Sequence, residues 1–168
     1  MIIALTGTPG TGKSTVSRLV DAGFGVVDLN ELIRDRYNLG TDPERGSVIA
    51  DLDGLTEYTE TLKGDNILEG HVAHFLPADV VIVLRTAPGI LRARLSQRGW
   101  SKAKIDENVE AEALDVILVE ALEMSDHVFE IDGTEMTLEQ IADAIREIAG
   151  GTDRYKPGSV DFSGELCP

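Results

Sequence analysis

Short runs of apolar residues recur along the chain, separated by longer segments of mixed polarity. Apolar runs of about four to eight residues, bounded by turn-forming residues, are typical of strands buried in a parallel sheet. The clearest run is Val-Val-Ile-Val-Leu at residues 80–84. We therefore predict five strands, at Ile2–Thr6, Phe24–Leu29, Asn66–Glu69, Asp79–Arg85 and His127–Ile131.

The segments between these strands carry apolar residues at helical spacing. Asn30 can cap one helix, and Thr137 with Gln140 forms a capping box for another. The predicted helices are Lys13–Asp21, Glu31–Tyr37, Asp53–Lys63, Pro88–Gln97, 101–124 and a last one ending near Ala149. Residues 38–47 contain Gly, Asp and Pro and are predicted to be a loop. Strands alternating with helices predict an α/β fold, in which a five-stranded parallel sheet is covered by helices on both faces.

Length and composition favour a single globular domain. The chain has 168 residues, of which 42% are hydrophobic and 27% charged. We assign residues 1–150 to the domain and 151–168 to a flexible, glycine-containing tail. No apolar run reaches the roughly 20 residues of a membrane span, and the first residues lack the basic region of a signal peptide. Cys167 is the only cysteine, which excludes an internal disulfide. We expect a cytoplasmic protein without membrane contact.

Charge is strongly acidic overall but unevenly distributed. Thirty acids against fifteen bases give a net charge of −15, which repels nucleic acid, so no sequence-specific nucleic-acid binding is expected. Acids are absent from residues 1–20 and from residues 80–105. The second stretch instead holds six basic residues, Arg85, Arg92, Arg94, Arg98, Lys102 and Lys104. Buried strands explain only part of this pattern, and we expect the two stretches to form an anion site.

A glycine-rich motif follows the first predicted strand. Residues Gly7–Ser14 match the phosphate-loop pattern G-x-x-x-x-G-K-[ST] in the strand-to-helix context that this pattern requires. Its glycines let the backbone N–H groups point inward around a phosphate, and its lysine reaches the β- and γ-phosphates. Ser14 is the expected Mg²⁺ ligand. The predicted ATP contacts are Gly10, Thr11, Gly12, Lys13, Ser14 and Thr15. A chance glycine turn is the alternative.

The third predicted strand ends at a second candidate site. Ligands bind at the carboxyl ends of parallel strands, where the segment Glu69-Gly70-His71 stands. Glu69 is the predicted carboxylate on the metal side of the site, with a solvated acid at the strand end as the alternative. An imidazole can orient water or a phosphate oxygen, so His71 is a functional candidate. We interpret His74 as structural.

Arginines neutralise the charge that spreads over phosphate oxygens during phosphoryl transfer. Arg94 and Arg98 are four residues apart and share one helix face. Arg34 lies on a different helix, so two separate arginine groups indicate two phosphate ligands, a donor and an acceptor. We interpret the remaining candidates as ordinary surface arginines: Arg36, Arg45, Arg146 and Arg154.

These motifs together resemble a known family. The pattern consists of Gly7–Thr15, the Arg34 helix, Glu69-Gly-His71 with Phe75 and Pro77, Val83-Leu-Arg85-Thr and Arg94-Leu-x-x-Arg98-Gly99-Trp100. It resembles the isoenzyme 6 type of adenylate kinase, which occurs in archaea and eukaryotes. The phosphate loop alone is unspecific, whereas the last two segments are characteristic of this family. The resemblance extends over about residues 1–148.

The resemblance implies the fold of a P-loop nucleoside monophosphate kinase, with a small AMP-binding lobe at about 29–52 and a short lid at about 98–108. It also implies the reaction ATP + AMP ⇌ 2 ADP, often with ATPase activity. A role in small ribosomal subunit maturation is implied as well, through a small-subunit ribosomal protein or a pre-ribosomal particle. By residue match, Arg34 would hold the AMP phosphate, Arg94 and Arg98 would bind ATP, and His71 would be the functional histidine. The expected catalytic residues are Lys13, His71 and Arg98.

Two departures from the family pattern keep other functions open. Eukaryotic relatives carry Asp where Glu69 stands, and residues 99–108 lack the further arginines of long-lid adenylate kinases, for which Lys102 or Lys104 could substitute. One alternative is an assembly-factor ATPase that consumes ATP without AMP. Another is a small-molecule kinase, for example for a sugar acid. A non-catalytic nucleotide-binding module fits less well, because it would not need Lys13, Glu69 and paired arginines.

Overall fold

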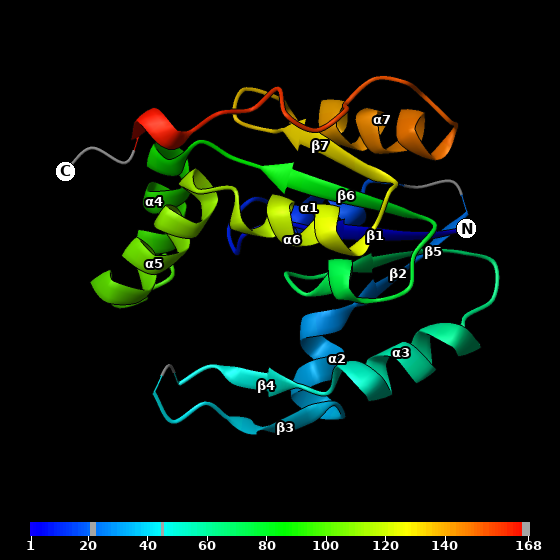
Figure 1. The fold of residues 1–168 in the computed structure, drawn as a ribbon, viewed down its shortest axis with the longest axis horizontal. Coiled ribbons are helices and arrows are strands. Elements are labelled where there is room, and N and C mark those ends of the chain that lie inside the picture. The colour runs from blue at the N-terminus through cyan, green and yellow to red at the C-terminus, as the bar shows by residue number, and fades with distance from the viewer. Residues whose placement is uncertain (21–22, 45, 166–168) are drawn as a thin grey trace.

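The computed structural model describes residues 1–20, 23–44 and 46–165. Its main sheet consists of five parallel strands in the spatial order β2-β5-β1-β6-β7 (Figure 1). The strands are β1 (Ile2–Thr6), β2 (Phe24–Asp28), β5 (Asp65–Glu69), β6 (Val80–Arg85) and β7 (Val128–Asp132). The predicted α/β fold with a five-stranded parallel sheet is confirmed.

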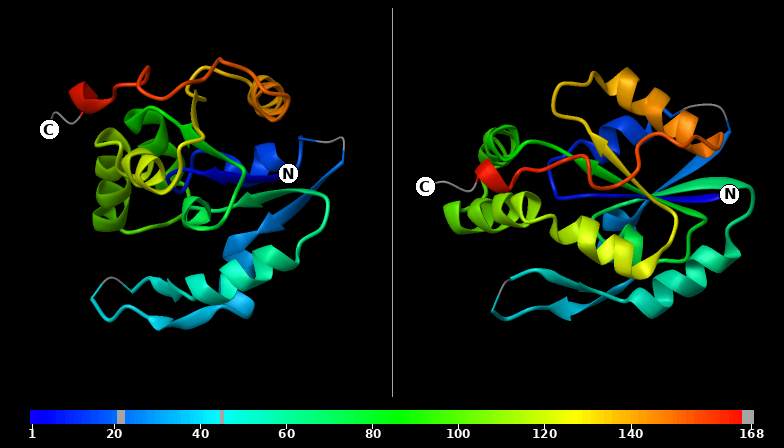
Figure 2. Two further views of the ribbon diagram at one scale, coloured as in Figure 1. Left: turned by 45° about the vertical axis from the view of Figure 1, so that its right-hand side comes forward. Right: turned by 45° about the horizontal axis from the view of Figure 1, so that its top comes forward.

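Helices cover both faces of this sheet, as the alternation of strands and helices predicts (Figures 1 and 2). The helices are α1 (Lys13–Ser17), α2 (Leu29–Asp35), α3 (Leu52–Thr61), α4 (Pro88–Ser96), α5 (Lys102–Ala113), α6 (Val116–Met124) and α7 (Leu138–Ala149). Helices α1 and α7 pack on one face, and α2, α3 and α6 on the other. The capping box of Thr137 and Gln140 opens α7 as predicted.

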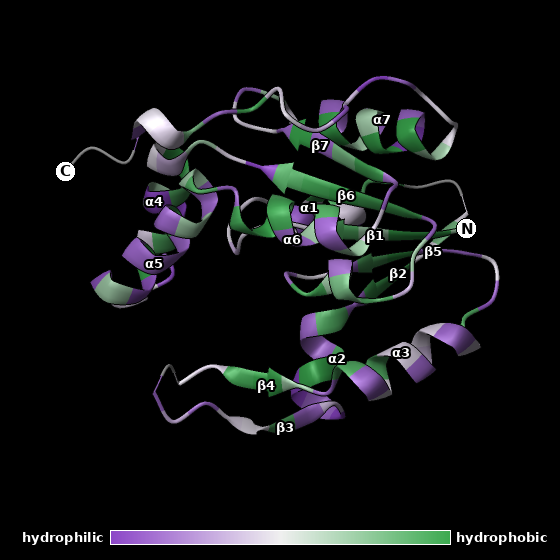
Figure 3. Cartoon of the chain, viewed as in Figure 1, coloured by the Kyte–Doolittle hydropathy of each residue, from purple (hydrophilic) through white to green (hydrophobic). Residues whose placement is uncertain are grey.

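The core is built from strands whose two faces are both apolar. Along β1, Ile3 and Leu5 point into the cluster beneath α1 and α7, whereas Ala4 belongs to the cluster on the opposite face. Along β6, Ile82 and Val83 divide between the clusters in the same way. Successive side chains of a strand alternate between faces, so a strand covered on both sides has a continuous apolar sequence. The central strands are accordingly among the most apolar parts of the chain (Figure 3).

Two further units extend from the main body on the side to which the strands point (Figures 1 and 2). One is the pair of helices α4 and α5, which share a small apolar cluster of Leu91, Leu95, Ile105 and Val109. The other is an antiparallel hairpin of β3 (Asn38–Thr41) and β4 (Val48–Ala50). The prediction of a loop over 38–47 is therefore wrong for Asn38–Thr41, which form β3, whereas the described residues between Thr41 and Val48 form the connection of the hairpin. Both strands are largely exposed, so the sequence lacks the apolar alternation that would indicate them.

The predicted helix over 101–124 is interrupted between α5 and α6. Asp115 has a φ of 57°, in the left-handed region, and ends the helical path. The buried Arg85 stabilises this break, because its Nη2 donates to Glu112 O at 2.8 Å and pairs with Asp115 Oδ1. The apolar residues divide at this break: Ile105 and Val109 of α5 pack against α4, whereas Ala121 of α6 packs against the sheet. Val116, at the start of α6, is 37% exposed.

Two other helix boundaries differ from the sequence prediction. Helix α1 ends at Ser17, although Val20 remains buried in the core and preserves the apolar spacing. Helix α2 is capped by Asp28, whose Oδ1 accepts a hydrogen bond from Glu31 N at 3.0 Å, and not by Asn30. The predictions that concern Asp21, Arg45 and Cys167 lie outside the described residues.

Residues 151–165, which the sequence predicts to be a flexible tail, lie against the main body. Tyr155 packs on the cluster beneath α7, and its carbonyl accepts a hydrogen bond from Glu130 N at 2.8 Å. Phe162 is buried, with the Arg85 guanidinium 5.4 Å from its ring centre. The short 3₁₀ helix η2 (Ser163–Glu165) follows; another, η1 (Ala73–Phe75), comes after β5. Within the described ranges, no helix has the length and apolar character needed to cross a bilayer.

Candidate active site

The phosphate loop connects β1 to α1 at the carboxyl edge of the sheet. Gly7, Gly10 and Gly12 all have φ near +100° or above, a conformation that side chains disfavour. A Cβ on Gly7 would lie 2.3 Å from Leu84 O, so this glycine also lets the loop approach β6. A Cβ on Gly12 would meet nothing among the described residues within 4 Å. The loop is therefore tight against the sheet and open on the side where a phosphate would bind.

Lys13 is folded back onto this loop. Its Nζ donates to Gly7 O at 2.7 Å and to Thr8 O at 3.1 Å, and the residue is only 6% exposed. Burial lowers the pKa of Lys13 to about 8, although the nearby Glu69 and Glu112 carboxylates oppose this shift. A phosphate in the loop would bring negative charge to the ammonium group and stabilise its protonated form. The geometry fits the predicted role of Lys13.

Glu69 ends β5 next to the phosphate loop and is fully buried. Neither carboxylate oxygen accepts a hydrogen bond from the described residues. Burial raises its pKa, an effect partly offset by the Ser14 hydroxyl and by Lys13. Unpaired buried carboxylates are costly, so this one suits a cation. Mg²⁺ prefers oxygen ligands and keeps several waters, and the Ser14 hydroxyl with the Glu69 carboxylate fits such an ion.

The two histidines that follow β5 have different surroundings. His71 is exposed, and its Nδ1 lies 3.2 Å from Asn30 Oδ1, which connects the strand end to α2. His74 is buried between Thr6 Oγ1 at 2.9 Å and Glu120 Oε2 at 3.2 Å, which agrees with a structural role. His71 thus stays a candidate for contact with a ligand.

A pocket of about 660 Å³ opens beside the phosphate loop. Arg94 and Arg98 line one side of it, and Arg94 Nη1 donates to Gly10 O at 3.2 Å. The Arg98 guanidinium lies 5.8 Å from the centre of the Trp100 ring. The pocket also takes in residues that the sequence analysis missed: Gln97, Gly133, Met136, Thr137, Leu138 and Ile141. Two predicted arginines and the phosphate loop therefore share one space.

The loop after β7 closes this pocket opposite the arginines. Gly133 N donates to Arg85 O at 3.0 Å, and Thr134 Oγ1 accepts from Ala87 N at 2.9 Å, so the loop is bonded to the end of β6 and to the segment that follows it. No local motif marks these residues, because their position follows from the pairing of β6 with β7. Only the rule that ligands bind at the carboxyl edge could have indicated the segment.

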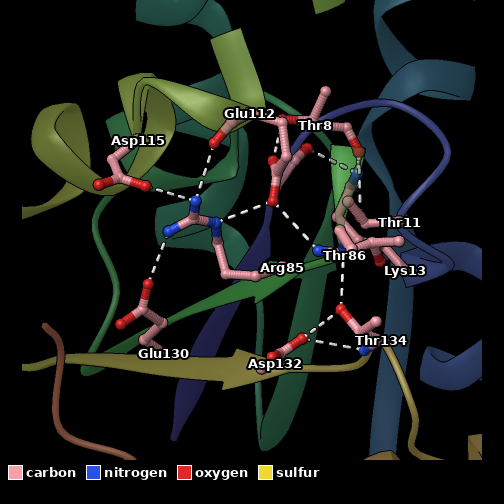
Figure 4. A network of polar contacts seen from close by, with 12 residues as sticks. Thr8, Thr11, Lys13, Arg85, Thr86, Glu112, Asp115, Glu130, Asp132 and Thr134 are labelled. Carbon is pink, nitrogen blue, oxygen red and sulfur yellow. Dashed lines mark hydrogen bonds and ion pairs between the residues drawn. The ribbon is translucent and has the colours of Figure 1, made fainter. Parts of the chain in front are cut away.

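The basic stretch at 85–104 does not act as one anion site. Arg85 is buried and bound by three carboxylates, those of Glu112, Asp115 and Glu130 (Figure 4). On the surface, Asp106 pairs with both Arg92 and Lys102. Lys104 lies over the Trp100 ring at 4.1 Å. Three of the six basic residues are thus paired with carboxylates within the protein, and the candidates for an anion site that line the pocket beside the phosphate loop are Arg94 and Arg98.

Arg34 lies on α2, away from the phosphate-loop pocket as defined by its lining residues. Its side chain is 66% exposed and binds Asp35 Oδ1 at 2.8 Å, with Glu31 nearby at 3.7 Å. These carboxylates, Asp35 first, raise its pKa. The structure therefore joins Lys13, Ser14, Glu69, Arg94 and Arg98 around one loop but leaves Arg34 in a separate region.

Comparisons with known proteins agree with this geometry. The family model described as "AAA domain" matches residues 3–115. A protein of Archaeoglobus fulgidus named "Putative adenylate kinase" is 47% identical over 99% of this chain and 94% of its own length. A protein of the same name from Methanothermobacter thermautotrophicus is 43% identical over 98% and 99%. The chain belongs to this adenylate kinase family.

Solved structures extend the likeness of this adenylate kinase family member to more distant kinases. Deoxyadenosine kinase from M. mycoides with bound dATP has a TM-score of 0.60 at 15% identity and covers 90% of this chain and 100% of its own. Shikimate kinase from Acinetobacter baumannii in complex with shikimate has a TM-score of 0.61 at 16% identity, covering 91% and 94%. At such identities the likeness concerns the fold, which is that of P-loop nucleoside and shikimate kinases.

Proposed function

We propose that the protein is a nucleoside monophosphate kinase that transfers the γ-phosphate of ATP to AMP and forms two ADP. The observation that carries this proposal is the phosphate loop itself, which holds the buried Lys13 and lines one pocket together with Arg94 and Arg98. The buried Glu69 carboxylate, whose oxygens accept no hydrogen bond from the described residues, lies close enough to Lys13 to act on its pKa. The name of the archaeal relatives supports it. The isoenzyme 6 type remains our interpretation of the sequence motifs.

In the proposed complex, the triphosphate of ATP lies on Gly10–Thr15 and its nucleoside in the pocket between Arg94, Arg98 and the loop after β7. Lys13 exchanges its carbonyl partners for the β- and γ-phosphates. Bound Mg²⁺, for which Ser14 and Glu69 are the proposed protein ligands, would neutralise charge on these phosphates. The donor half of the site thus supplies electrostatic stabilisation rather than covalent chemistry.

The acceptor AMP docks between the lobe at about 29–52 and the carboxyl edge of the sheet, with Arg34 on its phosphate. His71, hydrogen-bonded to Asn30 of α2, orients the acceptor side. An oxygen of the AMP phosphate attacks the γ-phosphorus, and the bond to the β-phosphate oxygen breaks. No general base is needed, because the attacking phosphate is already ionised. The lid at about 98–108 brings Arg98 over the phosphates and excludes water.

Hydrolysis of ATP by water is the competing function. It is favoured by the exposed position of Arg34, the residue proposed to hold the AMP phosphate. A lobe that holds AMP weakly leaves the γ-phosphate open to water. An assembly-factor ATPase acting on a ribosomal particle would consume ATP without AMP. ADP formation is therefore to be measured with and without AMP, and with a panel of other monophosphates and small acids as acceptors.

Replacing Lys13 by Ala tests the proposal most directly. We expect ADP formation from ATP and AMP to fall by at least about 10²–10³-fold, because a charge that stabilises the transition state is lost. A coupled assay of ADP release measures this. Lys63→Ala, at an exposed position after α3, is the matched control and should keep full activity. Unchanged turnover in Lys13→Ala would refute the proposal, and ADP release independent of AMP would favour the ATPase.

A further inference from the structure

A buried carboxylate outside the pocket holds the phosphate loop from behind. Glu112, in the last turn of α5, is 2% exposed. Its Oε2 accepts a hydrogen bond from the Thr8 hydroxyl at 2.5 Å, and its Oε1 accepts from Thr86 N at 3.1 Å and from Arg85 Nε at 2.8 Å (Figure 4). One side chain therefore connects α5, the end of β6 and the phosphate loop.

Thr8 connects Glu112 to Lys13 and Thr11, two residues proposed to contact ATP. Its carbonyl accepts hydrogen bonds from Lys13 Nζ at 3.1 Å, from Thr11 Oγ1 at 3.0 Å and from Thr11 N at 3.3 Å. Its own side chain is buried, away from solvent. The orientation of the Thr8 peptide thus sets where Lys13 and Thr11 lie, and the hydroxyl of Thr8 is fixed by Glu112.

Arg85 keeps Glu112 in place. It is 1% exposed and bound on several sides, by Glu112, Asp115 and Glu130, so it is not available to a ligand. A carboxylate that is charged and fully hydrogen-bonded in a dry setting is a rigid support, because every movement would cost a strong hydrogen bond. Arg85 and Glu112 therefore form a fixed frame behind the loop.

We propose that Glu112 is a positioning residue for ATP: through the Thr8 hydroxyl it holds the phosphate loop in the shape that binds the triphosphate. This inference rests on the proposed function, since it takes the loop to be the ATP site. It differs from a purely structural role of Glu112 in one respect. A structural role would change the binding of every ligand alike, whereas a positioning role affects ATP and leaves AMP unchanged.

The test uses the full chain and three variants. Thr8→Val removes the hydroxyl at constant size, and Glu112→Gln keeps the shape but loses the charged acceptor. Glu110→Gln, exposed on the same helix, is the matched control. Dissociation constants for ATP and for AMP are measured separately by calorimetry, alongside thermal melting. We expect Thr8→Val and Glu112→Gln to weaken ATP binding about tenfold, in line with the loss of one charge-assisted hydrogen bond, with AMP binding unchanged.

Two further variants sharpen the outcome. Thr8→Ser restores the hydroxyl and should recover most of the ATP affinity lost in Thr8→Val. The double variant Thr8→Val/Glu112→Gln should bind ATP no more weakly than Glu112→Gln alone, because the bond between Thr8 and the Glu112 carboxylate is already lost in that single variant. If Glu112→Gln does not fold, Thr8→Val decides alone.

Unchanged ATP affinity in Thr8→Val, or equal weakening of ATP and AMP, would overturn the inference. Failure of the proposed function looks different, because the unmodified protein would then bind no ATP, or would bind ATP but form no ADP in an AMP-dependent reaction. An unmodified protein that binds ATP normally, with variants that do the same, rejects only the role of Glu112.

Discussion

The two halves of the proposed active site differ in how deeply their side chains are buried. Around the phosphate loop, Lys13, Glu69 and Glu112 are buried. Lys13 donates hydrogen bonds to carbonyls of its own loop, and Glu112 accepts one from Thr8, 104 positions away in the chain. On the acceptor side, the hairpin of β3 and β4 is exposed along both strands, and Leu39 is 68% exposed. Arg34 contacts carboxylates of its own helix.

This difference indicates which half moves. Dense packing makes partial unfolding costly, whereas segments with few buried contacts open at a small free-energy cost. The ATP side is therefore preorganised before any nucleotide arrives. In the proposed reaction the acceptor lobe, in contrast, would have to close over AMP, and Arg34 would have to exchange Asp35 for the AMP phosphate. We expect substitutions on the ATP side to affect the chemistry, and those on the acceptor side to affect the affinity for AMP.

Glu69→Gln gives the largest effect expected from this comparison. The substitution keeps size and removes the charge that would hold Mg²⁺, so we expect kcat to fall by about 10²-fold or more and the Mg²⁺ requirement to rise. Rates measured across a Mg²⁺ titration check this. Glu60→Gln, exposed on α3, should behave like the unmodified protein. An unaltered Mg²⁺ dependence would remove Glu69 from the metal site.

Arg34→Ala tests the acceptor side. Loss of one guanidinium–phosphate contact should raise the KM for AMP about tenfold and leave the KM for ATP unchanged. Steady-state kinetics with each nucleotide varied in turn measure the two constants. Arg36→Ala, two residues further along, is the control. A change in the ATP constant, or none in the AMP constant, would contradict the assignment of Arg34 and leave the acceptor phosphate to other residues.

A smaller effect concerns pH. Burial lowers the pKa of Lys13 to about 8, so the free protein loses this charge as the pH rises through that value. Bound phosphates favour the ammonium form, and ATP binding above pH 8 must then take up a proton. We expect ATP affinity to fall about fourfold between pH 7 and pH 8.5. Calorimetry in two buffers of different ionisation enthalpy measures both affinity and proton uptake, with AMP as the reference ligand. Constant ATP affinity over this range would contradict the prediction.

The contrast between buried and exposed segments also explains which features could be predicted from the sequence. The buried strands, the phosphate loop and the capping box of Thr137 are encoded within a few neighbouring residues, and all three predictions agree with the structure. The hairpin of β3 and β4 buries little, so no apolar pattern indicated it. The break at Asp115 depends on Arg85, 30 residues away. Local patterns cannot reveal such a dependence.

The role of individual charges was the hardest part to predict. Arg85 belongs to a basic run in the sequence, yet the fold surrounds it with carboxylates from α5, the α5–α6 junction and β7. Thr8 and Glu112 are 104 positions apart. The pairing of β1 with β6 brings Thr8 near the end of β6, where Glu112 of α5 also bonds Arg85 and Thr86. The sequence therefore indicated a cluster of basic residues, but not which of its arginines are paired with carboxylates inside the protein.

The chain beyond α7 completes the enclosure of this charged centre. Glu130 uses one carboxylate oxygen for Arg85 and the other for Gly158 N at 2.9 Å, while Phe162 covers the guanidinium. A fragment that keeps these ionised groups shielded from solvent consequently has to extend to about residue 162. The domain boundary predicted from the glycines near residue 150 would leave this segment out. The segment that the sequence predicts to be a flexible tail therefore shields the buried ion pairs of Arg85 from solvent.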